Sequence, residues 1–143
     1  MNRAVAAIGV MVLAANTVWA QEDGEVSVKS MPPVPVKTVP QAGDVAVDPS
    51  ITEIRVTFSK PMTDKSWSWS QISDENFPRV TGKPHYLKDG KTCVLPVKLE
   101  PGKAYVLWLN SQKFRNFKDK EGQPAVPYLL VFETKSSGGG TVE

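Results

Sequence analysis

Hydrophobic and polar residues alternate in several stretches of the chain, among them residues 54–59, 93–99, 105–109 and 128–132. The first of these, Ile-Arg-Val-Thr-Phe-Ser, shows the pattern most clearly. A period of two places one row of side chains on a core and the other row in water, as in a half-buried β-strand. In residues 105–109 both rows are apolar, so we expect that strand to be covered on both faces.

Turn-forming residues separate these stretches. Asp89-Gly90 is typical of a tight hairpin turn, and Pro101-Gly102 marks another break. The pattern predicts seven strands, at residues 33–38, 51–59, 65–71, 78–87, 91–99, 104–110 and 127–134. Short strands with turns at this spacing indicate an all-β fold, namely an Ig-like or fibronectin III-like Greek-key β-sandwich of about seven strands.

The two ends of the chain differ from its middle. Residues 1–20 combine one positive charge, an uncharged apolar run and small residues at the end, which is the layout of a cleaved secretory signal. The apolar run, residues 4–15, is shorter than the roughly 20 residues that a membrane-spanning helix needs. We expect a flexible leader at 21–32, the sandwich domain at 33–135 and a flexible tail at 136–143. The mature protein is then periplasmic or secreted, without a membrane span.

The loop at residues 110–126 is the longest between predicted strands. It contains Phe114 and Phe117, which we expect to anchor it to the domain as an Ω-like loop. A second local pattern, Leu-Glu-Pro-Gly-Lys-Ala-Tyr at residues 99–105, places a tyrosine after a turn at the start of a strand. In β-sandwiches the hydroxyl of such a tyrosine bonds to upstream backbone, so this pattern predicts an architectural role for Tyr105.

Five short motifs follow one another along the predicted domain: Pro-x-x-Gly at 40–43, Phe-Ser-x-Pro-Met at 58–62, the Leu-x-Pro-Gly-x-x-Tyr corner at 99–105, Asp-x-x-Gly at 119–122 and Phe-x-Thr at 132–134. In this order they resemble the motifs of bacterial SbsA-type Ig-like domains. The resemblance covers almost all of the predicted domain. It implies that a set of residues within these motifs has a structural role: Phe58, Met62, Leu99, Tyr105 and Phe132. It also implies a module of secreted or surface proteins that serves spacing, display or partner binding, with no common catalytic activity.

The balance of charge argues against a nucleic-acid partner. The chain has 17 Lys and Arg against 15 Asp and Glu, for a net charge of +2. The densest basic stretch, residues 113–120, is interrupted by Asp119 and followed by Glu121. Nucleic-acid binders usually carry a clustered basic face, whereas here both signs are interspersed.

The residues that carry catalysis or bind metals are scarce. His85 is the single histidine and Cys93 the single cysteine, so no internal disulfide is possible. A Cys-His pair needs the two side chains in contact, but Cys93 lies in an apolar run and is expected to be buried. No nucleophile elbow or Gly-rich phosphate loop is present. We therefore expect no enzyme, no catalytic residues, no metal site and no cofactor.

Five residues in or near loops are candidates for binding a partner: Trp67, Trp69, Phe114, Arg115 and Phe117. The two tryptophans, two residues apart in a predicted strand, point the same way, either as a platform for a sugar or peptide or into the core. We expect an exported, non-catalytic module that is structural or binds an envelope protein or a surface polymer. The alternative is a small periplasmic carrier of copper or carbohydrate, because copper-resistance carriers share this sandwich and a similar Phe-Ser strand.

Overall fold

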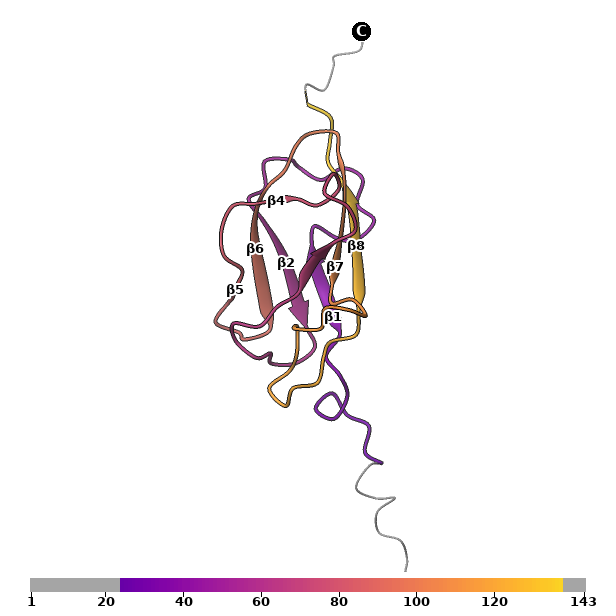
Figure 1. The fold of residues 1–143 in the computed structure, drawn as a ribbon, viewed down its shortest axis with the longest axis vertical. Coiled ribbons are helices and arrows are strands. Elements are labelled where there is room, and N and C mark those ends of the chain that lie inside the picture. Colours follow the sequence, from indigo (N-terminus) through magenta and orange to yellow (C-terminus); the bar gives the residue numbers. More distant parts are fainter. Residues whose placement is uncertain (1–23, 138–143) are drawn as a thin grey trace, which may run out of the picture.

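The computed structural model describes residues 24–137, which form two antiparallel β-sheets packed face to face (Figure 1). The predicted signal peptide and residues 138–143 of the predicted tail lie outside the described residues. The strands are β1 (Pro35–Val39), β2 (Glu53–Phe58), β3 (Trp69–Gln71), β4 (Arg79–Val80), β5 (His85–Tyr86), β6 (Thr92–Lys98), β7 (Ala104–Leu109) and β8 (Tyr128–Glu133). The described residues form no helix that could cross a membrane.

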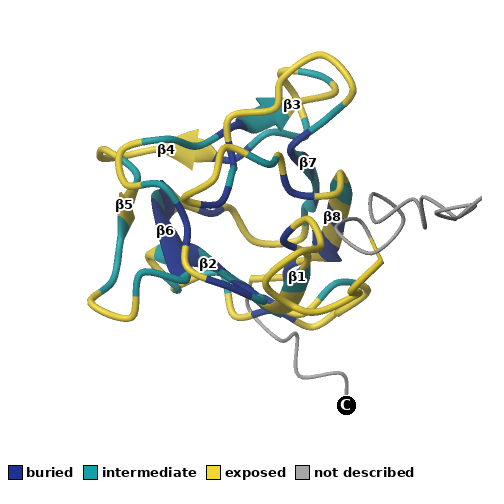
Figure 2. Cartoon of the chain, turned by 90° about the horizontal axis from the view of Figure 1, so that it is seen from below, coloured by how far each residue is buried: buried dark blue, intermediate teal, exposed yellow. Residues whose placement is uncertain are grey.

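The order of the strands defines an immunoglobulin-like sandwich. One sheet has the order β1-β2-β6-β4, with β5 also pairing with β6, and the other has the order β3-β7-β8. If β4 and β5 are counted as one edge strand, four strands face three in the order of constant-type immunoglobulin domains. The short strands β4 and β5 together take the place of one edge strand (Figure 2). The predicted all-β sandwich is confirmed.

The predicted strands at 65–71 and 78–87 differ most from the observed ones. The strand predicted at 78–87 divides into β4 and β5, because Pro84 has no N–H for a ladder and Gly82 weakens a strand. The strand predicted at 65–71 begins only at Trp69. Lys65 has a φ of 58°, a left-handed conformation that an extended strand does not contain.

Burial follows the alternation of the sequence in β2 and β7. In both strands buried residues alternate with partly exposed ones. We expected residues 105–109 to be covered on both faces, and this is wrong. Val106 and Trp108, on the outer face of β7, stay partly exposed. The strand with both faces buried is β6, where the four residues Thr92 to Leu95 are all buried.

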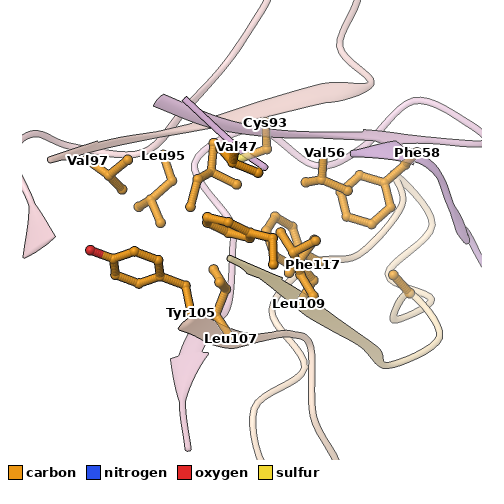
Figure 3. Packing of buried hydrophobic residues seen from close by; sticks show 14 of the residues in the cluster. Val47, Val56, Phe58, Cys93, Leu95, Val97, Tyr105, Leu107, Leu109 and Phe117 are labelled. Atoms are coloured by element: carbon orange, nitrogen blue, oxygen red, sulfur yellow. The ribbon is translucent and has the colours of Figure 1, made fainter. Parts of the chain in front are cut away.

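The core lies between the sheets and contains the predicted structural residues. Phe58, Met62, Leu99, Tyr105 and Phe132 are all at most 5% exposed. Figure 3 shows side chains from both sheets pointing toward one another. The predicted tyrosine corner is present, because the Tyr105 hydroxyl accepts a 2.8 Å hydrogen bond from the Glu100 N–H. This bond satisfies a backbone donor at the turn that leads into β7.

The described part of the predicted leader is an exposed turn that contacts the domain. The Met31 N–H donates to the Ser27 carbonyl at 3.0 Å. The buried Lys60 ammonium donates to the carbonyls of Lys29, at 2.6 Å, and Met31, at 3.2 Å. Lys60 thus attaches residues 29–31 to the end of β2.

Candidate functional site

A groove of about 410 Å³ opens between an edge of one sheet and an edge of the other. Its first wall is the chain at and before β3, and its second wall is the segment 77–84, which contains β4. Figure 2 shows β3 and β4 at neighbouring edges of the sandwich. Leu95 of β6 contributes from the core, and residues 114 and 116 of the long loop complete the lining. The side chains that line it are mainly apolar: Trp67, Trp69, Phe77, Val80, Pro84, Leu95 and Phe114.

Both tryptophans line this groove and also pack against the core. Trp69 makes an edge contact with Phe117, with ring centroids 5.3 Å apart. The ring centroids of Trp67 and Tyr86 are 6.5 Å apart. Because each indole is half-buried, one part of it belongs to the core and another part to the groove. The interpretation that they pack on the core is therefore correct in part, and the interpretation that they bind a partner stays a prediction.

The long loop is held against the domain by Asn110. Its side-chain amide donates to the carbonyls of Phe117, at 2.8 Å, and Ala125, at 3.0 Å, and its oxygen accepts from the Phe117 N–H at 2.9 Å. Asn110 is fully buried and has a φ of 57°, a conformation that asparagine tolerates better than most residues. This anchor was not found by sequence reasoning, because its partners lie 7 and 15 residues away.

The structure separates the three candidates in this loop. Phe117 is fully buried, with its ring 5.0 Å from that of Phe58, so the prediction that it contacts a partner is wrong and its predicted anchoring role is correct. Phe114 is 47% exposed and lines the groove. Arg115 is exposed beside it, with its Nε donating to the Gln112 carbonyl at 3.0 Å. Phe114 is therefore accessible in the groove and Arg115 adjoins it, and their part in binding stays a prediction.

Hydrogen bonds fix the loop and the two sheets at one end of the groove. The Asn116 N–H donates to the Ser68 hydroxyl at 2.9 Å, and the Ser66 hydroxyl donates to the Asn116 carbonyl. The Tyr86 hydroxyl donates to the Ser66 carbonyl at 2.9 Å. Burial raises the pKa of Tyr86 above its ordinary value, so the hydroxyl keeps its proton and remains a donor. The groove is thus built from restrained elements.

Positive charge flanks the groove on two sides. Segment 78–86 carries Arg79 and Lys83, and segment 111–116 carries Lys113 and Arg115. All four side chains are exposed, and neither segment contains an Asp or Glu. Arg79, however, lines a neighbouring pocket together with Asp74 and Glu100 rather than this groove. The positive charge beside the groove therefore comes from Lys83, Lys113 and Arg115.

The histidine and the cysteine are not brought together. His85 is exposed in β5 opposite Val94, whereas Cys93 is fully buried in the core. Neighbouring positions of a strand face opposite sides, so the two side chains lie on opposite faces of the sheet. Burial raises the pKa of Cys93 to about 12, against a smaller opposing effect of the Trp69 side chain, which keeps it a thiol. Residues 24–137 contain no group of three or more His, Cys, Asp and Glu side chains that could hold a metal ion.

The two sheets and their strand order define an immunoglobulin-like domain. The sequence model of the bacterial Ig-like domain family matches residues 29–134. This match covers most of the chain, and the protein belongs to that family.

A search of solved structures found a similar chain in the crystal structure of the S-layer protein rSbsC. The two are 20% identical, with a TM-score of 0.47, over 75% of this chain and 14% of that one. The matched region is a small part of that S-layer protein. A search of curated proteins found no match.

Proposed function

We propose that this chain is an exported, non-catalytic Ig-like module that binds a partner at the bacterial cell envelope through the groove beside β3. The observation that carries the proposal is the gathering of Trp67, Trp69 and Phe114 in one groove on restrained elements. Aromatic anchors in preformed pockets supply much of the energy of binding interfaces. Family membership supports a modular role, and the signal-like residues 1–20 support export.

We assign the chain more narrowly to the SbsA-type group within the family. The support is the set of motifs at 58–62, 99–105 and 119–122. The structure explains two of them, since Phe58 and Met62 are core residues and Tyr105 forms the corner. Domains of this group serve surface display and spacing, which is compatible with partner binding through one face.

The test uses the exported protein with single substitutions in and away from the groove. Phe114→Ala removes a groove residue that is 47% exposed, and Val126→Ala removes a similarly exposed residue, at 46%, that is absent from the groove lining. Each protein is immobilised and incubated with native envelope extract, and retained molecules are quantified by mass spectrometry. We expect the partner to be retained by the wild type and Val126→Ala and lost from Phe114→Ala. Equal retention by Phe114→Ala contradicts the proposal.

A second candidate is a carrier of carbohydrate in the same groove. The observation that favours it is the half-exposed pair Trp67 and Trp69 beside the exposed Asn116, because indole faces stack on sugar rings and amides bind hydroxyls. Binding to an array of envelope glycans, lost on Phe114→Ala, would favour this candidate over a protein partner. For copper, the other ligand of the alternative, we propose no site.

A further inference from the structure

We infer that the groove takes an extended acidic segment of a partner polypeptide, which adds as a strand to the free edge of β3. An apolar side chain of that segment enters the groove, and its carboxylates face the basic residues on either side. This inference rests on the proposed function and names the class of partner. Three observations support it: the edge of β3, the apolar lining and the local charge.

The first observation is the direction of the main-chain groups in β3. Within the described residues β3 pairs with β7 alone. The Asn110 N–H donates to the Ser68 carbonyl at 3.1 Å, so residues 68 and 110 form a hydrogen-bonded pair. In an antiparallel ladder such pairs alternate with pairs whose N–H and C=O groups point outward. Trp69 and Gln71 therefore present main-chain groups at the free edge, which is the template for strand addition.

The second observation is the chemistry of the lining next to that edge. The polar residues of the lining are Ser68, Ser70 and Asn116. The Ser68 hydroxyl already accepts a hydrogen bond from the Asn116 N–H, at 2.9 Å. Sugars need several convergent polar partners, whereas a polypeptide strand obtains its hydrogen bonds from the backbone edge and needs only an apolar pocket for a side chain. The lining therefore favours a polypeptide over a polysaccharide.

The third observation is the uniform charge of the flanking segments. Lys83 lies on one side and Lys113 and Arg115 on the other, and no carboxylate interrupts either segment. Arg79 is not part of this set, because it lines a neighbouring pocket together with Asp74 and Glu100. The nearby Asp74, at the far end of β3, already accepts a hydrogen bond from the Gln71 amide at 2.7 Å. Complementary charge around an apolar centre sets specificity and the rate of association. The segment that fits has an apolar residue between acidic ones.

The experiment measures binding of a labelled probe peptide, Glu-Asp-Thr-Val-Leu-Val-Thr-Asp-Glu, to the exported protein by fluorescence anisotropy. A second peptide replaces every Glu and Asp with Gln and Asn, and a third keeps the side chains but carries N-methyl groups on alternate amides. We expect the acidic peptide to bind at least about tenfold more tightly than either of the others. Its binding should weaken as salt is added, since exposed charges are screened.

Matched variants locate the site. Lys83→Glu reverses a charge beside the groove. Lys37→Glu makes the same change of charge on β1, which is the opposite edge strand of the sheet that contains β4. We expect Lys83→Glu to weaken the acidic peptide by about tenfold and Lys37→Glu to have little effect. Both lysines are exposed, so neither change should unfold the domain, and a thermal melt of each variant verifies this.

Each alternative result overturns the inference. If the N-methylated peptide binds as well as the acidic one, no strand is added to β3. If an acidic polysaccharide such as polygalacturonate binds and the acidic peptide does not, the partner belongs to another class. If none of the probes binds while the envelope partner is still lost from Phe114→Ala, the proposed function stands and the inference about its partner is wrong.

Discussion

The ammonium of Lys60 lies 2.8 Å from a carboxylate oxygen of Asp119, and both side chains are buried. The other oxygen of Asp119 accepts from the N–H groups of Glu121, at 3.0 Å, and Gln123, at 2.8 Å. Lys60 follows β2 and Asp119 belongs to the long loop, so the pair joins one sheet to the loop that flanks the groove. It also unites two motifs that are far apart in the sequence, Phe-Ser-x-Pro-Met and Asp-x-x-Gly.

Removal of one partner of this ion pair should destabilise the fold. Lys60→Met leaves the buried Asp119 carboxylate without its counter-ion, and we expect a loss of about 3 kcal/mol or more in the free energy of unfolding. The double variant Lys60→Met with Asp119→Asn removes both charges and keeps an oxygen for the two N–H groups of the turn. It should be more stable than Lys60→Met alone. Urea unfolding of both variants measures the difference, and equal stability would show that the charge of Asp119 is already compensated elsewhere.

Stability should fall in acid because of the same carboxylate. Burial by itself would raise the pKa of Asp119, but the hydrogen bond and charge of Lys60 and the N–H donors of the turn together lower it below the ordinary value of 3.8. Because the pKa of Asp119 is lower in the folded than in the unfolded protein, the carboxylate stabilises the fold at pH values above its unfolded-state pKa. This stabilisation is lost as the pH falls through the folded-state pKa. Unfolding measured from pH 7 down to pH 2 should show a decline that begins near pH 4.

Substitution of Asp119 should make this decline smaller without abolishing it. Asp119→Asn does not titrate, so the difference between its stability and that of the wild type should shrink in acid. Asp48 and Asp89 also have lowered pKa values, each because of hydrogen bonds with neighbouring residues, and they retain part of the decline. A difference that stays constant from pH 7 to pH 2 would contradict the assignment.

Asn110 should be among the most sensitive polar positions. Asn110→Ala removes three hydrogen bonds in a buried site and forces alanine to adopt a positive φ, so we expect a loss of about 3 kcal/mol or more. In Asn110→Gly the glycine adopts the positive φ without strain, so this variant should lose less stability than Asn110→Ala. Equal losses would mean that the positive φ does not contribute to the effect of the alanine substitution. Asn116→Ala, at an exposed residue of the same loop, is the control and should change stability by less than about 0.5 kcal/mol. Chemical unfolding compares the three.

The tyrosine corner predicts a smaller and specific effect. Tyr105→Phe keeps the ring, which stacks on Phe132 with centroids 5.4 Å apart, and removes the hydroxyl that accepts from the Glu100 N–H. We expect a loss of about 1 kcal/mol, with faster hydrogen exchange of the Glu100 amide. Tyr128→Phe, on β8, is the control. Unchanged exchange at Glu100 would mean that water replaces the hydroxyl without cost.

The two phenylalanines of the long loop should behave in opposite ways. Phe117→Ala opens a cavity in contact with Phe58 and Trp69, and we expect a loss of about 3–5 kcal/mol. Phe114→Ala removes a ring that is 47% exposed and should cost less than about 1 kcal/mol. Thermal unfolding of both variants checks this. A large loss for Phe114→Ala would assign that ring to the core rather than to binding.

Sequence reasoning located most of the strands because their burial depends on local alternation. In β2 the apolar positions Ile54, Val56 and Phe58 are the buried ones. It erred where main-chain geometry intervened, at Lys65 and at Pro84, since a positive φ and a missing N–H end a ladder whatever the neighbouring side chains are. It also assigned Phe117 to a binding surface, because a loop position alone does not reveal burial.

The sequence by itself indicated the class of fold through its strands and turns. It also determined the corner at Tyr105 and the buried row of β2, because these depend on one turn and on alternation within a strand. Only the tertiary structure decided which aromatic side chains share a groove. Trp67, Val80 and Phe114 come from three separate segments, and no local pattern relates them. Their meeting depends on how the two sheets pack and on the Asn110 anchor of the loop, which are long-range interactions that a periodic pattern does not encode.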